Sequence, residues 1–85
     1  MKANKIYLVV AQYTGFDTGY KVVSTPQFTK NSANIEALKF ALSEKEALKE
    51  GGYTFAVIQH ENGYIKVIAD GTLATIYHIV ALPIV

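Results

Sequence analysis

Residues 5–13 are mostly apolar and rich in β-branched and aromatic side chains, which predicts a first strand. Turn-forming residues, Gly15, Asp17 and Gly19, follow this segment. Residues 20–25 again carry strand-forming side chains, so the two segments predict a β-hairpin. The polar stretch 26–34 is expected to be a loop.

Residues 35–50 carry the helical pattern, because Ala, Leu, Lys and Glu dominate and Gly51 and Gly52 supply a stop. The apolar side chains at helical spacing, expected to face a sheet, are Ile35, Leu38, Ala41, Leu42 and Leu48. A capping-box pattern over 43–46 allows an alternative, in which the helix begins at Glu44 and 38–42 is extended. We favour the single longer helix.

The last third predicts a three-stranded meander over 53–60, 64–69 and 73–82. Two strong hairpin signals, Asn62-Gly63 and Asp70-Gly71, separate these strands. The chain is therefore expected to form one α+β domain over residues 1–85, with element order ββαβββ and the helix packed on one face of the sheet.

The register of the meander follows from the lengths of its turns. A two-residue turn at Asn62-Gly63 pairs His60 with Ile65. A turn at Asp70-Gly71 that takes in Thr72 as an extra residue and places Ile68 opposite Leu73 pairs Ile65 with Ile76. The face expected under the helix then carries Ala56, Ile58, Ile65, Val67, Ala69, Ala74, Ile76 and Val80. The opposite face carries Tyr53, Phe55, Val57, Gln59, Tyr64, Lys66, Ile68, Leu73, Thr75, Tyr77 and Ile79.

This opposite face is too polar for a core and too apolar for plain exposure to solvent, and it has the tyrosine-rich composition of a recognition surface. The candidate binding residues on it are Tyr64, Tyr77, Lys66, Gln59, Phe55 and Thr75. Three arrangements would bury such a face. The N-terminal hairpin could fold over it to form a sandwich, a second copy of the chain could pack on it, or a different partner could bind it.

Composition narrows the function classes. The 85 residues are 51% hydrophobic and 18% charged, with a net charge of +1, which excludes intrinsic disorder. All eight cations are Lys, and the absence of Arg argues against nucleic-acid readout. The absence of Cys excludes disulfides and thiolate chemistry and favours a reducing compartment, the cytoplasm. The apolar segments 6–11 and 73–85 are too short to cross a membrane.

Catalytic signals are weak. The triplet 17–19, Asp-Thr-Gly, matches aspartic proteases by its letters alone and reads better as a turn. His60 and His78 are expected on one face, about 9–10 Å apart across the middle strand, without a nearby acid. We therefore predict no metal site, no cofactor and no enzymatic activity.

The element layout resembles that of many small phage-encoded accessory and inhibitor proteins, which implies an interaction protein. We expect a cytoplasmic, non-enzymatic binding or inhibitor module that forms a homodimer and contacts another protein through the aromatic sheet face. The alternative is a small-molecule-binding or sequestering protein, in which Lys66 pairs with an anionic, nucleotide-like ligand in a dimer cleft.

Overall fold

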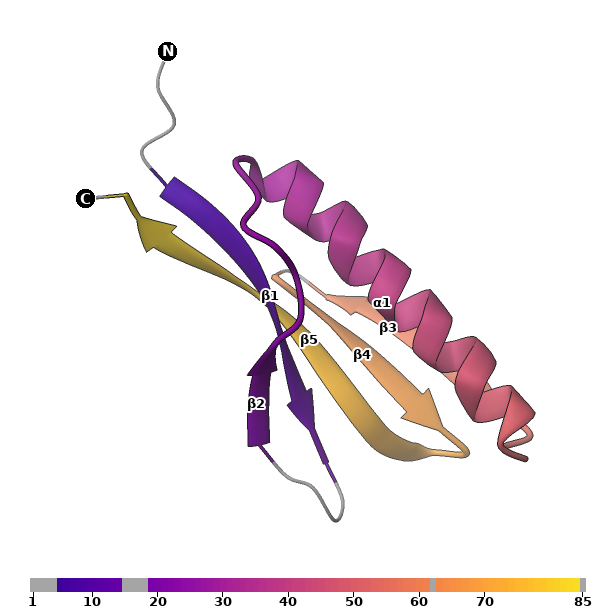
Figure 1. Ribbon diagram of the computed structural model, residues 1–85. Coiled ribbons are helices and arrows are strands. Elements are labelled where there is room, and N and C mark those ends of the chain that lie inside the picture. Colours follow the sequence, from indigo (N-terminus) through magenta and orange to yellow (C-terminus); the bar gives the residue numbers. More distant parts are fainter. Residues whose placement is uncertain (1–4, 15–18, 62, 85) are drawn as a thin grey trace.

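A computed structural model describes residues 5–14, 19–61 and 63–84. One helix lies along one face of a five-stranded antiparallel sheet, which confirms the expected α+β class and the ββαβββ order (Figure 1). The elements are β1 (Lys5–Tyr13), β2 (Gly19–Val22), α1 (Lys30–Glu50), β3 (Ala56–Glu61), β4 (Tyr64–Ala69) and β5 (Thr72–Pro83). The predicted turn over 15–18, with most of the Asp-Thr-Gly triplet, and Asn62 lie outside the described residues.

The N-terminal hairpin joins the meander edge to edge, giving the strand order β2-β1-β5-β4-β3. β1 pairs with β5 along its whole length, from Lys5 opposite Pro83 to Tyr13 opposite Thr75. The sandwich arrangement is therefore wrong. Because the hairpin extends the sheet, only the face that carries α1 receives a second layer from the described chain (Figure 1).

The turn between β4 and β5 contains two residues, not three. Asp70 and Gly71 both have positive φ, 48° and 81°, as a type I′ turn requires. Ala69 therefore pairs with Thr72 across the turn. The expectation that Thr72 belongs to the turn is wrong, because this turn type matches the twist of the two strands without a third residue.

The extra residue lies inside β5 as a β-bulge. Ile68 pairs with Leu73, but the next partners along the strands are Val67 and Thr75. Ala74 is therefore the unpaired residue of the bulge. Pairs before the bulge agree with the predicted register, and every pair after it is shifted by one residue.

This shift exchanges the faces of β5, because side chains alternate with period two. Thr75, Tyr77 and Ile79 lie on the α1 side, since their strand partners Val67, Ile65 and Val9 belong to it. The placement predicted for these three residues, and for Ile76 and Val80 on the α1 side, is wrong. The β3–β4 pairing was predicted correctly, and Ala56, Ile58, Ile65, Val67 and Ala69 do lie on the α1 side.

The helix begins five residues earlier than expected, at Lys30. Thr29 is its N-cap, and the Thr29 side chain accepts a hydrogen bond from the backbone N–H of Ser32 over 3.0 Å. The helix ends at Glu50, before Gly51, as predicted. The loop predicted for 30–34 and the alternative start at Glu44 are both wrong. No stretch of α1, the helix in the described part of the chain, is apolar enough to cross a membrane.

The helix turns its small side chains toward the sheet. Ala33, Ala37 and Ala41 are fully buried, whereas the larger Ile35, Leu38 and Leu42 are exposed. The predicted apolar stripe is therefore wrong at these three larger residues and correct at Ala41 and Leu48. Alanines fit beneath the helix because larger residues on the sheet, such as Tyr77, fill the space there.

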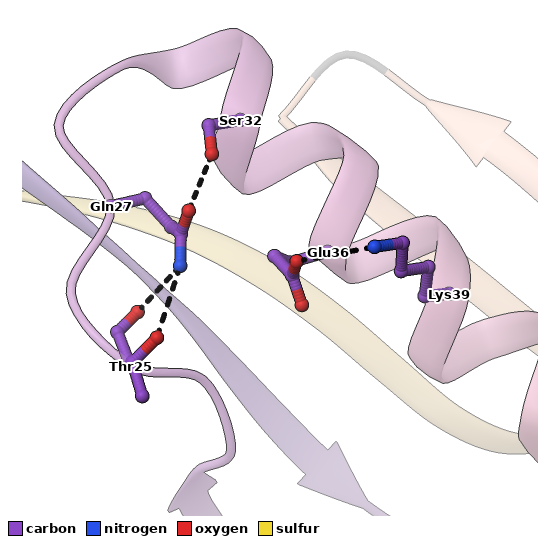
Figure 2. A network of polar contacts seen from close by, with 5 residues as sticks. All are labelled: Thr25, Gln27, Ser32, Glu36 and Lys39. Carbon is purple, nitrogen blue, oxygen red and sulfur yellow. Dashed lines mark hydrogen bonds and ion pairs between the residues drawn. The ribbon is translucent and has the colours of Figure 1, made fainter.

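Gln27 joins three parts of the fold in the connection from β2 to α1. Its backbone forms two hydrogen bonds with the backbone of Tyr7 on β1. Its side-chain amide donates to Thr25 and accepts from the Ser32 hydroxyl in the first turn of α1 (Figure 2). The helix start is thereby tied to the sheet. The ion pair between Glu36 and Lys39, one turn further, lies at the surface.

Candidate protein-interaction face

The open face is the side of the sheet away from α1. Strand pairing assigns to it Ile6, Leu8, Val10, Gln12, Tyr20, Val22, Val57, Gln59, Glu61, Tyr64, Lys66, Ile68, Ile76, His78, Val80 and Leu82. None of these side chains is buried, whereas the α1 side holds the whole buried core of the sheet. A five-stranded sheet thus presents a largely apolar surface without a covering layer among the described residues.

Two neighbouring rows of side chains cross the middle of the open face. The upper row, one residue from each strand, is Glu61, Tyr64, His78, Val10 and Val22. The lower row is Gln59, Lys66, Ile76, Gln12 and Tyr20. Each row runs from β3 to β2, so residues far apart in sequence lie side by side.

His78 is the centre of a polar and aromatic cluster in these rows. Its Nε2 lies 2.8 Å from the Gln12 side-chain oxygen, at hydrogen-bond distance. The rings of Tyr64 and Tyr20 lie on either side, with centroids 6.0 Å and 6.5 Å from the imidazole centroid. The Lys66 ammonium lies 5.6 Å from the centroid of the Tyr64 ring, within the range of a cation–π contact. The cluster spans four strands, β4, β5, β1 and β2.

Aliphatic residues flank the cluster on the open face. Val22 and Val57, at opposite edges of the sheet, are each 53% exposed, and Val80 and Leu82 toward the end of β5 are also exposed. Aromatic residues are enriched near the centres of protein interfaces, so the two tyrosines of the cluster suit this face to binding a protein.

Three of the six candidate binding residues, Tyr64, Lys66 and Gln59, lie together on this face. Phe55 lies just before β3 and is 69% exposed, and its backbone N–H donates to the Asp70 carboxylate over 2.6 Å. Its side chain is available at the edge of the sheet, outside the two rows.

Tyr77 and Thr75, the other two candidates, lie beneath α1. Tyr77 is only 5% exposed and Thr75 is buried. Both hydroxyl groups donate to Glu44 of α1, each over 2.6 Å and each to a different carboxylate oxygen. The Phe40 ring stacks on Tyr77 with centroids 6.1 Å apart. This arrangement joins helix to sheet and keeps both residues away from a partner on the open face.

Burial raises the pKa of the Tyr77 phenol well above its usual range, and the hydrogen bond to Glu44 raises it further. Tyr77 is therefore a neutral donor at physiological pH. Because both carboxylate oxygens of Glu44 accept hydroxyl hydrogens, the group serves to fix the helix on the sheet.

A cleft of about 520 Å³ opens at the other end of the sheet, where α1 ends near the β4–β5 turn. It is lined by Thr14, Leu48, Tyr53, Ala69, Thr72, Leu73 and Ala74. No lining residue is charged, and Lys66 lies on the opposite face of the sheet. The cleft therefore offers no cation to an anionic ligand.

The two histidines lie on opposite faces, since His60 pairs with Ile65 and His78 with Tyr64. The expectation that they share a face is wrong for the same one-residue shift in β5. Within residues 5–14, 19–61 and 63–84, no three His, Asp or Glu side chains come together as metal ligands would.

Sequence reasoning missed His78, Gln12 and Tyr20 as parts of the cluster. The β1–β5 and β1–β2 pairings bring them together, and no turn signal in the meander determines those pairings. One signal was present: the polar residues Gln12 and His78 each interrupt an otherwise apolar strand. Single polar residues in two strands that can pair suggest a polar contact between the strands.

Comparison of the chain with protein-family models, with curated proteins and with solved structures finds no match.

Proposed function

We propose that this chain is a small, non-enzymatic protein-binding module whose contact surface is the open face of its sheet. One observation carries the proposal: a cluster of Tyr64, His78, Tyr20 and Lys66 lies at the middle of a largely apolar sheet face that no other described part of the chain covers. Tyrosine contributes large contact area with little loss of side-chain entropy, which suits such a surface to protein recognition.

An accessory or inhibitor role is consistent with this mode of action, because a rigid sheet face can cover a site on another protein. The lack of cysteine suits a reducing compartment, so we place the activity in the cytoplasm.

A test compares the wild-type chain with a Tyr20→Ala, Tyr64→Ala double variant. Truncating two central aromatic residues is expected to weaken binding to any protein held by this face at least about tenfold. Tyr53→Ala is the matched control, since Tyr53 is exposed and lies off the open face. Circular dichroism establishes that all variants fold. Equal binding by the double variant and the wild type would contradict the proposal.

A second candidate function is small-molecule binding, which the cleft near the end of α1 favours. Because its lining is uncharged, we expect a neutral, largely apolar compound there rather than the nucleotide-like ligand that the sequence suggested. A thermal shift with neutral aromatic compounds, absent in Leu48→Ala, would support this function. A shift with nucleotides that depends on Lys66 would instead favour the anionic ligand.

A further inference from the structure

We propose that the second layer over the open face is a second copy of this chain, packed face to face across a twofold axis. The inference rests on the proposed function, because it names the protein that the open face binds. It follows from the dimensions of the face, its charges and the order of its two central rows.

The open face has the dimensions of a dimer interface. Five strands about 4.8 Å apart make it roughly 20 Å wide, and nine residues of β1 make it about 30 Å long. The projected area of about 600 Å² is of the same order as the roughly 800 Å² of accessible surface that each partner buries in a stable complex. Side chains add accessible area to the projection.

The charges of the face complement each other. Among the described residues of the face, Glu61 and Lys66 are the only ionisable ones besides His78 and the tyrosines, and their charges have opposite signs. Neither forms an ion pair in the described part of the chain, where the one ion pair is between Glu36 and Lys39 on α1. A strongly acidic or strongly basic partner would meet no opposite excess of charge on this face. A second copy would supply a glutamate for Lys66 and a lysine for Glu61.

The two central rows place these charges for a twofold contact. Glu61 lies in the upper row and Lys66 in the neighbouring lower row, on adjacent strands. We place the twofold axis in the plane of the interface, parallel to the two rows and midway between them. Rotation about this axis lays the upper row of each copy over the lower row of the other copy. Lys66 then lies near Glu61 of the second copy, twice in the dimer. The two sheets enclose the aliphatic flanks, as in aligned sheet packing about 10 Å apart.

The net charge of +1 also permits self-association, because two copies repel each other little. All contacts of the proposed dimer are therefore made by residues of the two copies.

The experiment is sedimentation velocity on the full chain over a series of concentrations, with three charge reversals. Lys66→Glu and Glu61→Lys each place like charges at both contacts, and each is expected to raise the dimer dissociation constant at least about tenfold. An equimolar mixture of the two variants restores both contacts and is expected to form a heterodimer as tightly as the wild type. Lys21→Glu is the matched control, because Lys21 lies on the same sheet and its strand partner, Ala11, belongs to the α1 side.

Recovery in the mixture also shows that both variants fold. A wild-type chain that stays monomeric, a dimer unaffected by the single reversals, or reversals that the mixture does not rescue would each overturn the face-to-face dimer. The proposed function is tested separately. If the wild type is monomeric but binds another protein, and Tyr20→Ala, Tyr64→Ala loses that binding, the open face remains a binding surface with a different occupant.

Discussion

Glu44 makes two of the contacts that hold α1 on the sheet, through the hydroxyl groups of Thr75 and Tyr77. Charge-assisted hydrogen bonds of 2.6 Å in a partly buried site are stronger than neutral ones. Burial raises the pKa of Tyr77 most, and the hydrogen bond to Glu44 raises it further, so Glu44 links the position of the helix to the ionisation of a buried phenol.

Glu44→Ala leaves two buried hydroxyl groups without their acceptor. We expect the free energy of unfolding to fall by about 1–3 kcal/mol, measured by urea denaturation. Glu46→Ala, on the exposed side of the same helix, is the control and should change it by less than about 0.5 kcal/mol. Equal effects of the two substitutions would show that the Glu44 contacts do not stabilise the fold.

Alkaline pH tests the buried phenol of Tyr77. Its pKa in the folded chain lies above the unfolded value of about 10, so above that pH the folded state binds more protons than the unfolded state. This contribution to stability is complete below about pH 10 and is lost as the pH rises further, by up to about 1.4 kcal/mol per pH unit. Tyr77→Phe should lose stability less steeply from about pH 9 to about pH 11 in urea titrations. Parallel curves would contradict the assignment.

At the scale of elements, the fully buried positions of α1 are alanines, whereas three larger residues, Ile35, Leu38 and Leu42, are exposed. Ala37→Leu should therefore overpack the helix–sheet contact and cost about 1–3 kcal/mol of unfolding free energy. Leu38→Ala, one residue further and exposed, should change it by less than about 0.5 kcal/mol. Both substitutions exchange strong helix formers, so propensity contributes little. The reverse order of effects would place the other side of the helix on the sheet.

Most elements were predictable because their signals are local: the strand composition of 5–13, the Gly51 stop and the Asn62-Gly63 hairpin. Two features were not. Three of the residues in 30–34, Asn31, Ser32 and Asn34, are weak helix formers. The helix there is supported by the Thr29 cap and by the Gln27 contacts with β1. In β5 both sets of alternating residues are mostly apolar, so hydrophobic alternation could not reveal a bulge that exchanges them.

The candidate site was half predictable for the same reason. Tyr64, Lys66 and Gln59 were placed correctly, because the predicted β3–β4 register, from Glu61 opposite Tyr64 onward, is the one that the structure has. Tyr77 and Thr75 were exchanged for Ile76 and His78 by the bulge. The contributions of Gln12 and Tyr20 required the order of β2, β1 and β5, which arises from contacts distant in sequence.

At the scale of the whole molecule, a face-to-face dimer couples folding to association. Its melting temperature should rise with protein concentration, because each tenfold increase stabilises the dimer by about 1.4 kcal/mol, or about 0.7 kcal/mol per chain. That corresponds to about 3–6 °C per tenfold for a domain of this size. Differential scanning calorimetry on the wild type and on Lys66→Glu provides the test, since the variant, with its weaker dimer, should melt at a lower temperature than the wild type at each concentration. A wild-type melting temperature that does not change with concentration would contradict the coupling.

The bulge at Ala74 has a consequence at the level of the gene, where it corresponds to a single codon. Removing that codon would turn the following part of β5 over, exposing Tyr77 and placing His78 under the helix. Replacing the alanine by another residue would leave the register unchanged. Mutational scans of this strand should therefore tolerate substitutions at Ala74 but not a deletion there, so the spacing between the Asp70-Gly71 turn and Tyr77 matters more than the identity of the residue that fills it.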